Sequence, residues 1–225
     1  TGGFEFFKPK RRNIFRSIYL NIYLSKFKNK KTMVYFLGRA ERVSDINYAH
    51  ETFDEMRCSV QDVVDVAKKL NMELVIKTHP AFITGLKWLK LILKDSKSIH
   101  FSSRFPARDY LDCADIVIVS KSSVSIEALA RDLPVVVYSH EPRIVEYLDE
   151  ISVGIEDYKT QMRCPLFRAV GVSQLFNTVH LIQDNVSYLE CIRKKNQLYP
   201  FLTHCNLDNG QSGRVLDAVK EICSK

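Results

Sequence analysis

The chain has 225 residues, of which 46% are hydrophobic and 26% charged, so it can bury a substantial core. It contains no apolar run of about 18 residues, which excludes a membrane-spanning helix within this sequence. Six cysteines are scattered without a C-x-x-C pair, which argues against a zinc site or a disulfide scaffold. We therefore expect a cytoplasmic location. Because the sequence begins at Thr1 rather than Met, we also expect it to be a fragment or a processed form.

The net charge of +7 is concentrated at one end of the chain. Residues 1–31 hold nine Lys/Arg and one acid, whereas residues 32–225 are nearly neutral. The apolar residues of this basic segment recur at helical spacing: Ile14, Phe15, Ile18, Tyr19, Ile22, Tyr23 and Phe27. One hypothesis is a linker helix that packs on a domain outside the sequence. Another is that residues 8–31 contact an anionic membrane surface, at the inner face of the membrane. A nucleic-acid partner is not expected, because no aromatic RNA-binding motif accompanies the charge.

From residue 32 the sequence alternates between apolar strands and helices. The predicted strands cover 32–38, 72–80, 98–103, 115–121 and 133–139. The predicted helices cover 52–70, 83–96, 107–114 and 123–132, and then 172–185, 186–199 and 211–224. Strands this apolar, separated by helices, are typical of a parallel sheet covered on both faces. The predicted fold class is α/β: one doubly wound, Rossmann-like domain over 32–225 with additional C-terminal helices.

In this fold, ligands bind where strands end and loops lead into helices. The strand ends in chain order are Gly38-Arg39, Lys77-Thr78-His79-Pro80, Ser102-Ser103-Arg104-Phe105-Pro106, Ser120-Lys121-Ser122-Ser123 and Ser139-His140-Glu141. Basic and hydroxyl groups collect at these ends. Helix N-termini offer free N–H groups to anions, and Ser122 and Ser123 would add hydroxyl donors there. With charge from Lys121 or His79, the serine turn is predicted to hold a phosphate.

Ordinary helix capping is the alternative explanation for the serines. A capping box that starts at Ser123 needs Glu or Gln at position 126, which is Ile126, and the acid Glu127 comes one residue later. A box from Ser122 would fall on Ser125. His79 is alternatively a structural histidine at a strand end. We favour the phosphate hypothesis because histidine and serines are predicted to lie on adjacent loops.

The segments "KTHP" (77–80), "SSVSIEAL" (122–129) and "LPVVVYS" (133–139) resemble the nucleotide-binding, C-terminal half of GT-B glycosyltransferases. More narrowly, they are similar to bacterial capsule polysaccharide and Kdo transferases and to related HP-motif enzymes that use CMP- or CDP-linked donors. The segment "DNGQSGRVLDAVKEI" (208–222) is similar to the "DG-x-x-S-x-R" segment that often closes such chains. The resemblance covers about residues 32–222.

This resemblance implies a function and a set of site residues. It implies transfer of a sugar from a nucleotide-activated donor to a glycan or lipid-linked acceptor, in capsule or surface polysaccharide synthesis. His79, Ser122 and Ser123 would contact the donor phosphate, with Lys121 adding charge. Glu127 would lie near the ribose or the sugar. Phe105 and Pro106 would lie near the nucleoside base.

The chain also departs from this family pattern. Position 119, eight residues before Glu127, is Val119, which disfavours the retaining enzymes with an E-x7-E motif. A GT-B enzyme has two Rossmann-like halves, of which the acceptor half usually supplies the catalytic base. We therefore expect an N-terminal half outside this sequence, and the identity of the catalytic base stays unknown. No metal or cofactor is expected, because no Asp/Glu ligand set is evident. Three alternatives remain: a CDP-alcohol phosphotransferase, a UDP-sugar 2-epimerase-like enzyme, or a non-catalytic nucleotide-binding module of a larger synthase.

Overall fold

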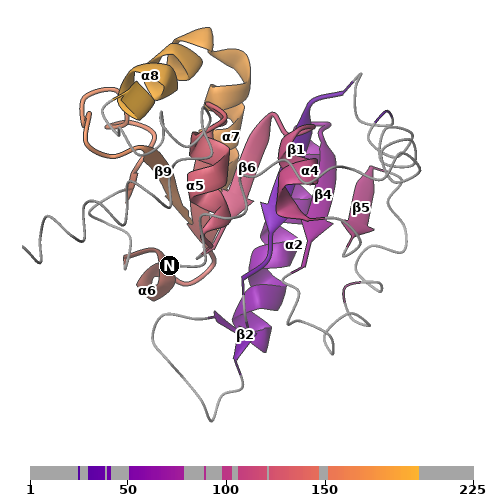
Figure 1. Cartoon of the computed structure of the whole chain (residues 1–225). Helices are drawn as coiled ribbons and strands as arrows, with labels where there is room; N and C mark the ends of the chain where they lie inside the picture. Colours follow the sequence, from indigo (N-terminus) through magenta and orange to yellow (C-terminus); the bar gives the residue numbers. More distant parts are fainter. Residues whose placement is uncertain are drawn as a thin grey trace, which may run out of the picture.

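The computed structural model in Figure 1 describes residues 25, 30–38, 40–41, 51–78, 89, 98–102, 106–120, 122–146 and 152–197. Its strands are β1 (Thr32–Phe36), β2 (Ala40–Glu41), β3 (Glu51–Thr52), β4 (Glu73–Lys77), β5 (Ile99–Ser102), β6 (Ile116–Val119), β7 (Val135–Ser139), β8 (Ser152–Val153) and β9 (Leu166–Val170). Its helices are α2 (Phe53–Lys69), α4 (Ala107–Leu111), α5 (Val124–Leu129), α6 (Pro142–Glu146), α7 (Gly171–Asp184) and α8 (Val186–Gln197).

Seven of these strands form one parallel sheet in the order β5-β4-β1-β6-β7-β9-β8, and β2 pairs with β3 in a separate short ladder. Within the described residues every pair in the large sheet is parallel. The carboxyl ends of the strands therefore share one edge. The arrows in Figure 1 point toward the bottom of the view, where the start of α2 and helix α6 also lie.

Each face of the sheet has its own apolar core, because successive strand residues point to opposite sides. The first core lies beneath α2 and α7, and its strand residues include Tyr35, Leu74, Ile118, Tyr138 and Phe167. The second lies beneath α4 and α5, and its strand residues include Phe36, Val75, Val119 and Val137. Full burial of one such aliphatic or aromatic side chain is worth about 1.5–3 kcal/mol, so covering both faces stabilises the domain.

The structure confirms the predicted α/β class and five of the predicted strands, as β1, β4, β5, β6 and β7. It also confirms the helices predicted over 52–70, 107–114, 123–132, 172–185 and 186–199. The predicted helices at 83–96 and 211–224 lie outside the described residues, apart from helical Leu89, and so does most of the basic segment 1–31.

Beyond residue 140 the sequence pattern predicts helices and no strand, and this prediction is wrong, because β8 and β9 extend the sheet past β7. β9 is less continuously apolar than the central strands, since Arg168 and Val170 are only half-buried. Its last residue leads directly into α7 through Gly171, whose φ of +70° favours glycine. A strand that short, joined to a helix without a loop, gives a weak sequence signal.

Behind β9, a buried lysine ties α8 to the loop that leads into the strand. Lys195 is fully buried, and its ammonium donates to the carbonyls of Gln161 and Cys164, both at 2.9 Å. The same nitrogen lies 3.3 Å from the centre of the Tyr158 ring, which stacks on Phe167 of β9. Burial lowers the pKa of Lys195. The charge is thus compensated by carbonyl dipoles and an aromatic face.

We predict that Lys195→Met destabilises the fold by roughly 2–3 kcal/mol, because the Gln161 and Cys164 carbonyls lose a charged donor. Chemical denaturation measures the loss. The matched control is the exposed neighbour Lys194, whose replacement by Met is expected to change stability by less than about 0.5 kcal/mol. Equal unfolding midpoints for the two variants would show that Lys195 has no such role.

Candidate functional site

The carboxyl edge of the sheet contains the topological switch point of the fold. β1 and β6 are neighbours at the centre of the sheet, with Val34 opposite Val117. The chain leaves β1 toward α2 and leaves β6 toward α5, and these helices cover opposite faces. The strand ends therefore diverge there, which is where open α/β sheets bind ligands.

The serine turn lies at this edge, between β6 and α5. Ser122 is half-buried and its hydroxyl accepts from the Val124 N–H at 3.3 Å, while Ser125 donates to the Ser122 carbonyl at 2.8 Å. Ser123 is exposed and makes no capping hydrogen bond with its side chain. Local capping therefore uses the Ser122 hydroxyl once, as an acceptor, and does not use the Ser123 hydroxyl. Among the described residues, neither hydroxyl donates a hydrogen bond.

The other predicted site residues are only partly within the described chain. His79, Lys121 and Phe105 lie outside it, so their positions stay predictions. Pro106 is exposed and directly precedes α4. Glu127 is half-buried on α5, and burial raises its pKa, partly offset by the charges of Arg131 and Arg108. The structure therefore brings Ser122, Ser123 and Glu127 into one strand–turn–helix unit.

Lys77 is a buried cation at the end of β4, immediately before the predicted histidine motif. Its side chain is 6% exposed, and its ammonium donates to the Thr78 carbonyl at 2.8 Å. No carboxylate within the described residues forms an ion pair with it. Burial lowers its pKa. In the sequence, Lys77 stands out only as part of a strand end. Its burial in the structure makes it a candidate source of positive potential at this edge.

A buried carboxylate organises the neighbouring strand end, after β7. Glu51 is 2% exposed, and its Oε1 accepts from Ser59 at 2.6 Å and from Ser139 at 2.8 Å. The two serine hydroxyls in turn accept the backbone N–H groups of His140 and Glu141, at 2.9 and 3.2 Å. Each hydroxyl thus has a fixed direction, as acceptor from backbone and donor to Glu51.

The second oxygen of Glu51 has a different environment. Within the described residues, neither Glu51 Oε2 nor the buried hydroxyl of Tyr35 has a hydrogen-bond partner. Burial raises the pKa of Glu51, although the Ser59 and Ser139 hydrogen bonds oppose the shift. Burial and then the Glu51 charge raise the pKa of Tyr35. Since Oε1 only accepts, a neutral Glu51 carries its proton on Oε2.

An aspartate–histidine pair extends this network to the surface. Asp62 Oδ2 accepts from the Tyr138 hydroxyl at 2.5 Å and lies 2.7 Å from His140 Nδ1. Tyr138 and His140 are two residues apart, so both reach α2 from the same side of β7. The Asp62 side chain is 15% exposed and that of His140 45%. The hydrogen bond to Asp62 is the main cause of the raised pKa of His140.

The start of α2 is fixed by a capping box and an ion pair. Thr52 accepts from the Glu55 N–H at 3.3 Å, and the Glu55 carboxylate accepts from the Thr52 N–H at 2.7 Å. Glu55 also accepts from Arg143 of α6 at 2.6 and 2.5 Å. Burial tends to raise the pKa of Glu55, but the bonds to Arg143 and Thr52 lower it overall. The ends of α2 and α6 are thereby joined at the same edge.

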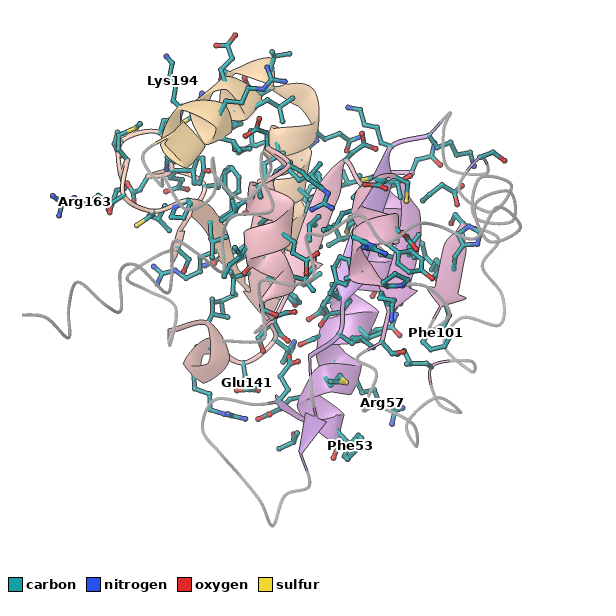
Figure 2. All side chains as sticks on the ribbon, in the orientation of Figure 1. Phe53, Arg57, Phe101, Glu141, Arg163 and Lys194 are labelled. Atoms are coloured by element: carbon teal, nitrogen blue, oxygen red, sulfur yellow. The ribbon has the colours of Figure 1, made fainter. Side chains whose placement is uncertain are left out.

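Figure 2 shows this meeting of elements. Phe53 and Arg57, in the first turns of α2, and Glu141, just before α6, all lie toward the lower end of the view, where the strands finish. Lys194 and Arg163 lie at the opposite end. The polar network of Glu51, Asp62 and His140 lies at the same edge, because it is bonded to Ser139, the last residue of β7, and to the residue after it.

The prediction of site residues from sequence missed the Asp62–His140 pair and the Glu51 network. The order T-F-D-E over 52–55 does carry a signal, since Thr followed three residues later by Glu marks a capping box. Nothing in the spacing reveals that Ser139 meets Glu51, 88 residues away, or that His140 meets Asp62, 78 residues away. Those contacts depend on how α2 crosses the sheet.

No cluster of three or more His, Cys, Asp or Glu side chains in the described residues is arranged to hold a metal ion. None of the helices in that part of the chain combines the length and the apolar character needed to cross a bilayer.

Comparison with solved structures supports the fold. The chain is similar to UDP-GlcNAc 2-epimerase from Neisseria meningitidis bound to UDP-GlcNAc, with a TM-score of 0.57, 12% identity, and coverage of 92% of this chain and 50% of that one. It is similar to S. aureus MnaA in its co-structure with UDP, with a TM-score of 0.53, 13% identity, and coverage of 89% and 48%. It is also similar to the wall teichoic acid polymerase TagF, with a TM-score of 0.50, 15% identity, and coverage of 92% and 48%.

These similarities show a Rossmann-like α/β fold of the type found in GT-B glycosyltransferase-like proteins. The chain spans about half the length of each of these structures. No protein-family model matches the sequence, and comparison with curated proteins gives no match. The fold is therefore established at the level of architecture, as a Rossmann-like α/β domain.

We predict that Glu51→Gln flattens the dependence of stability on pH. Because the folded pKa of Glu51 is raised, its favourable contribution is complete below its ordinary value of 4.5 and is lost as pH rises through the folded value. Gln stays neutral, its carbonyl can accept from Ser59 and Ser139, and its amide replaces the proton of Oε2. Thermal unfolding from about pH 4 to pH 8 measures the slope.

The control for this prediction is Glu51→Ala. It removes the acceptor of both serine hydroxyls and should cost roughly 1–3 kcal/mol at low pH, where Glu51 contributes fully, and less as pH rises. A Glu51→Gln protein whose unfolding temperature follows the wild-type curve across the whole range would contradict the assignment of that slope to Glu51.

Proposed function

We propose that the chain is the donor-binding half of a glycosyltransferase that uses a nucleotide-activated sugar. The observation that carries the proposal is the serine turn at the switch point, where Ser122 and Ser123 follow a buried parallel strand. The motifs "KTHP" and "SSVSIEAL" resemble the phosphate-contacting segments of CMP- and CDP-dependent transferases, which supports this proposal. The donor is accordingly CMP- or CDP-linked, and the acceptor is a surface or capsule polysaccharide.

In this proposal each site residue has a defined role. Ser122, Ser123 and His79 donate hydrogen bonds to the donor phosphate, and Lys121 contributes charge. Glu127 lies near the ribose or sugar, and Phe105 and Pro106 near the base. Because α5 has only six residues, we assign the binding energy to the side chains rather than to the helix dipole. Donors fixed before the reaction stabilise the charge that develops on the leaving nucleotide.

A UDP-sugar 2-epimerase-like enzyme is the second candidate. It is favoured by the two structural neighbours whose titles name UDP-GlcNAc and UDP. Against it, the chain has "KSSVS" at the turn where epimerases carry a glycine-rich segment. The choice of nucleotide separates the two: cytidine nucleotides for the transferase, UDP for the epimerase.

The acceptor side of the reaction involves parts of the chain beyond the described domain. We propose that a second Rossmann-like half supplies the catalytic base. The basic segment 8–31 either packs on that half or holds the enzyme at an anionic membrane, close to a lipid-linked acceptor. Each basic residue near such a surface contributes about 1 kcal/mol.

We predict that CMP or CDP raises the thermal unfolding temperature of the wild type and that the double substitution Ser122→Ala with Ser123→Ala removes this protection. Each lost hydroxyl–phosphate hydrogen bond is worth about 1.5–3 kcal/mol, because the acceptor is charged. Thermal unfolding with CMP, CDP and UDP, followed by calorimetric titration, makes the measurement.

The matched control is Ser125→Ala. This substitution removes the hydrogen bond to the Ser122 carbonyl and weakens the helix start, but it leaves both proposed phosphate donors in place. Its protection by nucleotide should equal that of the wild type. If the double variant is protected as well as the wild type, the serines are caps and the phosphate assignment fails.

A further inference from the structure

We propose that His140, positioned by Asp62, is a second imidazole of the phosphate site and binds the donor phosphate through Nε2. This inference rests on the proposed function. It assigns a ligand contact to the end of β7, where the sequence places His140 among the strand-end residues but predicts no role for it in the site. Asp62 does not touch the ligand and acts through the histidine.

The first observation is the register of the two neighbouring strands. β6 and β7 are parallel, and Val119 pairs with Val137. Ser122 and His140 each follow their paired valine by three residues. Since neighbouring strands lie about 4.8 Å apart, the serine turn and His140 leave the sheet side by side at the same edge. A phosphate held by Ser122 would therefore lie at the strand end next to the one that His140 follows.

The second observation is the fixed orientation of the ring. The Asp62 carboxylate accepts from Tyr138 at 2.5 Å and faces His140 Nδ1 at 2.7 Å, so Nδ1 carries a hydrogen. No hydrogen-bond partner of Nε2 occurs among the described residues, and the side chain is 45% exposed. The hydrogen bond to Asp62 therefore fixes Nδ1 and leaves Nε2 for a ligand. When Nε2 is protonated it is a charged donor, which suits a phosphate oxygen.

The third observation is the balance of charge around the ring. Asp62 from α2, Glu51 from β3 and Glu141 from the β7–α6 connection act on His140, and the Tyr138 hydroxyl of β7 donates to the same Asp62 oxygen. Asp62 pairs with His140 itself, and burial raises the pKa of Glu51, which favours its neutral form. The nearby Glu55 is paired with Arg143. Glu141 is the remaining acid, so the surroundings favour a protonated ring without presenting a strongly negative surface to an anion.

The test combines binding with a direct titration of the histidine. Calorimetry with CDP at a series of pH values gives affinities for the wild type, His140→Gln and Asp62→Asn. NMR of the imidazole protons gives the pKa of His140, whose signal among the six histidines is identified by its loss in His140→Gln. The matched control is His180→Gln, an exposed histidine on α7. The titration of the nucleotide phosphate is common to all variants.

The expected result has three parts. In the wild type, the affinity for CDP falls as pH rises through the pKa of His140, and CDP shifts the His140 signal. His140→Gln binds about ten- to a hundredfold more weakly at low pH and lacks that pH-dependent component. Asp62→Asn lowers the pKa of His140 and moves the fall in affinity to lower pH, whereas His180→Gln behaves as the wild type.

Two results would overturn the inference, and they are distinguishable. If the wild type binds CDP while His140→Gln has the same affinity and pH profile, His140 is not a phosphate ligand and the proposed function stands without it. If the folded wild type binds none of CMP, CDP and UDP, the proposed function and this inference fail together. Thermal unfolding of each variant verifies that the proteins compared are folded.

Discussion

The arrangement of the candidate site depends on one buried carboxylate. Glu51 is almost fully enclosed, and burial of a carboxyl group is costly unless its hydrogen bonds are satisfied. Ser59 of α2 and Ser139 of β7 satisfy one of its oxygens. Because both serines also accept backbone N–H groups after β7, the carboxylate determines where His140 and Glu141 leave the sheet. A local interaction before α2 therefore positions a strand end that is distant in sequence.

The doubly wound topology brings this network and the serine turn to the same edge of the sheet. α2 covers the face that carries Tyr35 and Tyr138, and α5 covers the face that carries Phe36 and Val137. The network reaches the carboxyl edge from the first face, and the serine turn reaches it from the second. A ligand at the switch point would meet donors from both sides, which is the general reason why open α/β sheets bind ligands there.

The sequence predicts the sheet well because its central strands are continuous apolar runs. Strands such as "VVVYS" and "IVIV" are buried on both faces, and that pattern is hard to confuse with an exposed element. β9 was missed because two of its five residues are only half-buried, and β8 because it has two residues. The candidate serines could be predicted because motif and strand end coincide. The Asp62–His140 pair could not, because its two members belong to elements brought together only by the crossing of α2.

The serine, lysine and histidine side chains at this edge differ in the hydrogen bonds and the charge that they can supply. Serine hydroxyls are neutral at every pH of interest, so Ser122 and Ser123 would supply directional donors whose strength does not vary with pH. A lysine supplies charge, but the buried Lys77 already donates to the Thr78 carbonyl and its pKa is lowered by burial. A histidine backed by Asp62 supplies charge that depends on pH and a ring that cannot rotate freely. The serines would supply directed donors, and a lysine supplies positive charge. Among the described residues, His140 would supply both. An aspartate placed one helix away is sufficient to give an exposed imidazole both properties.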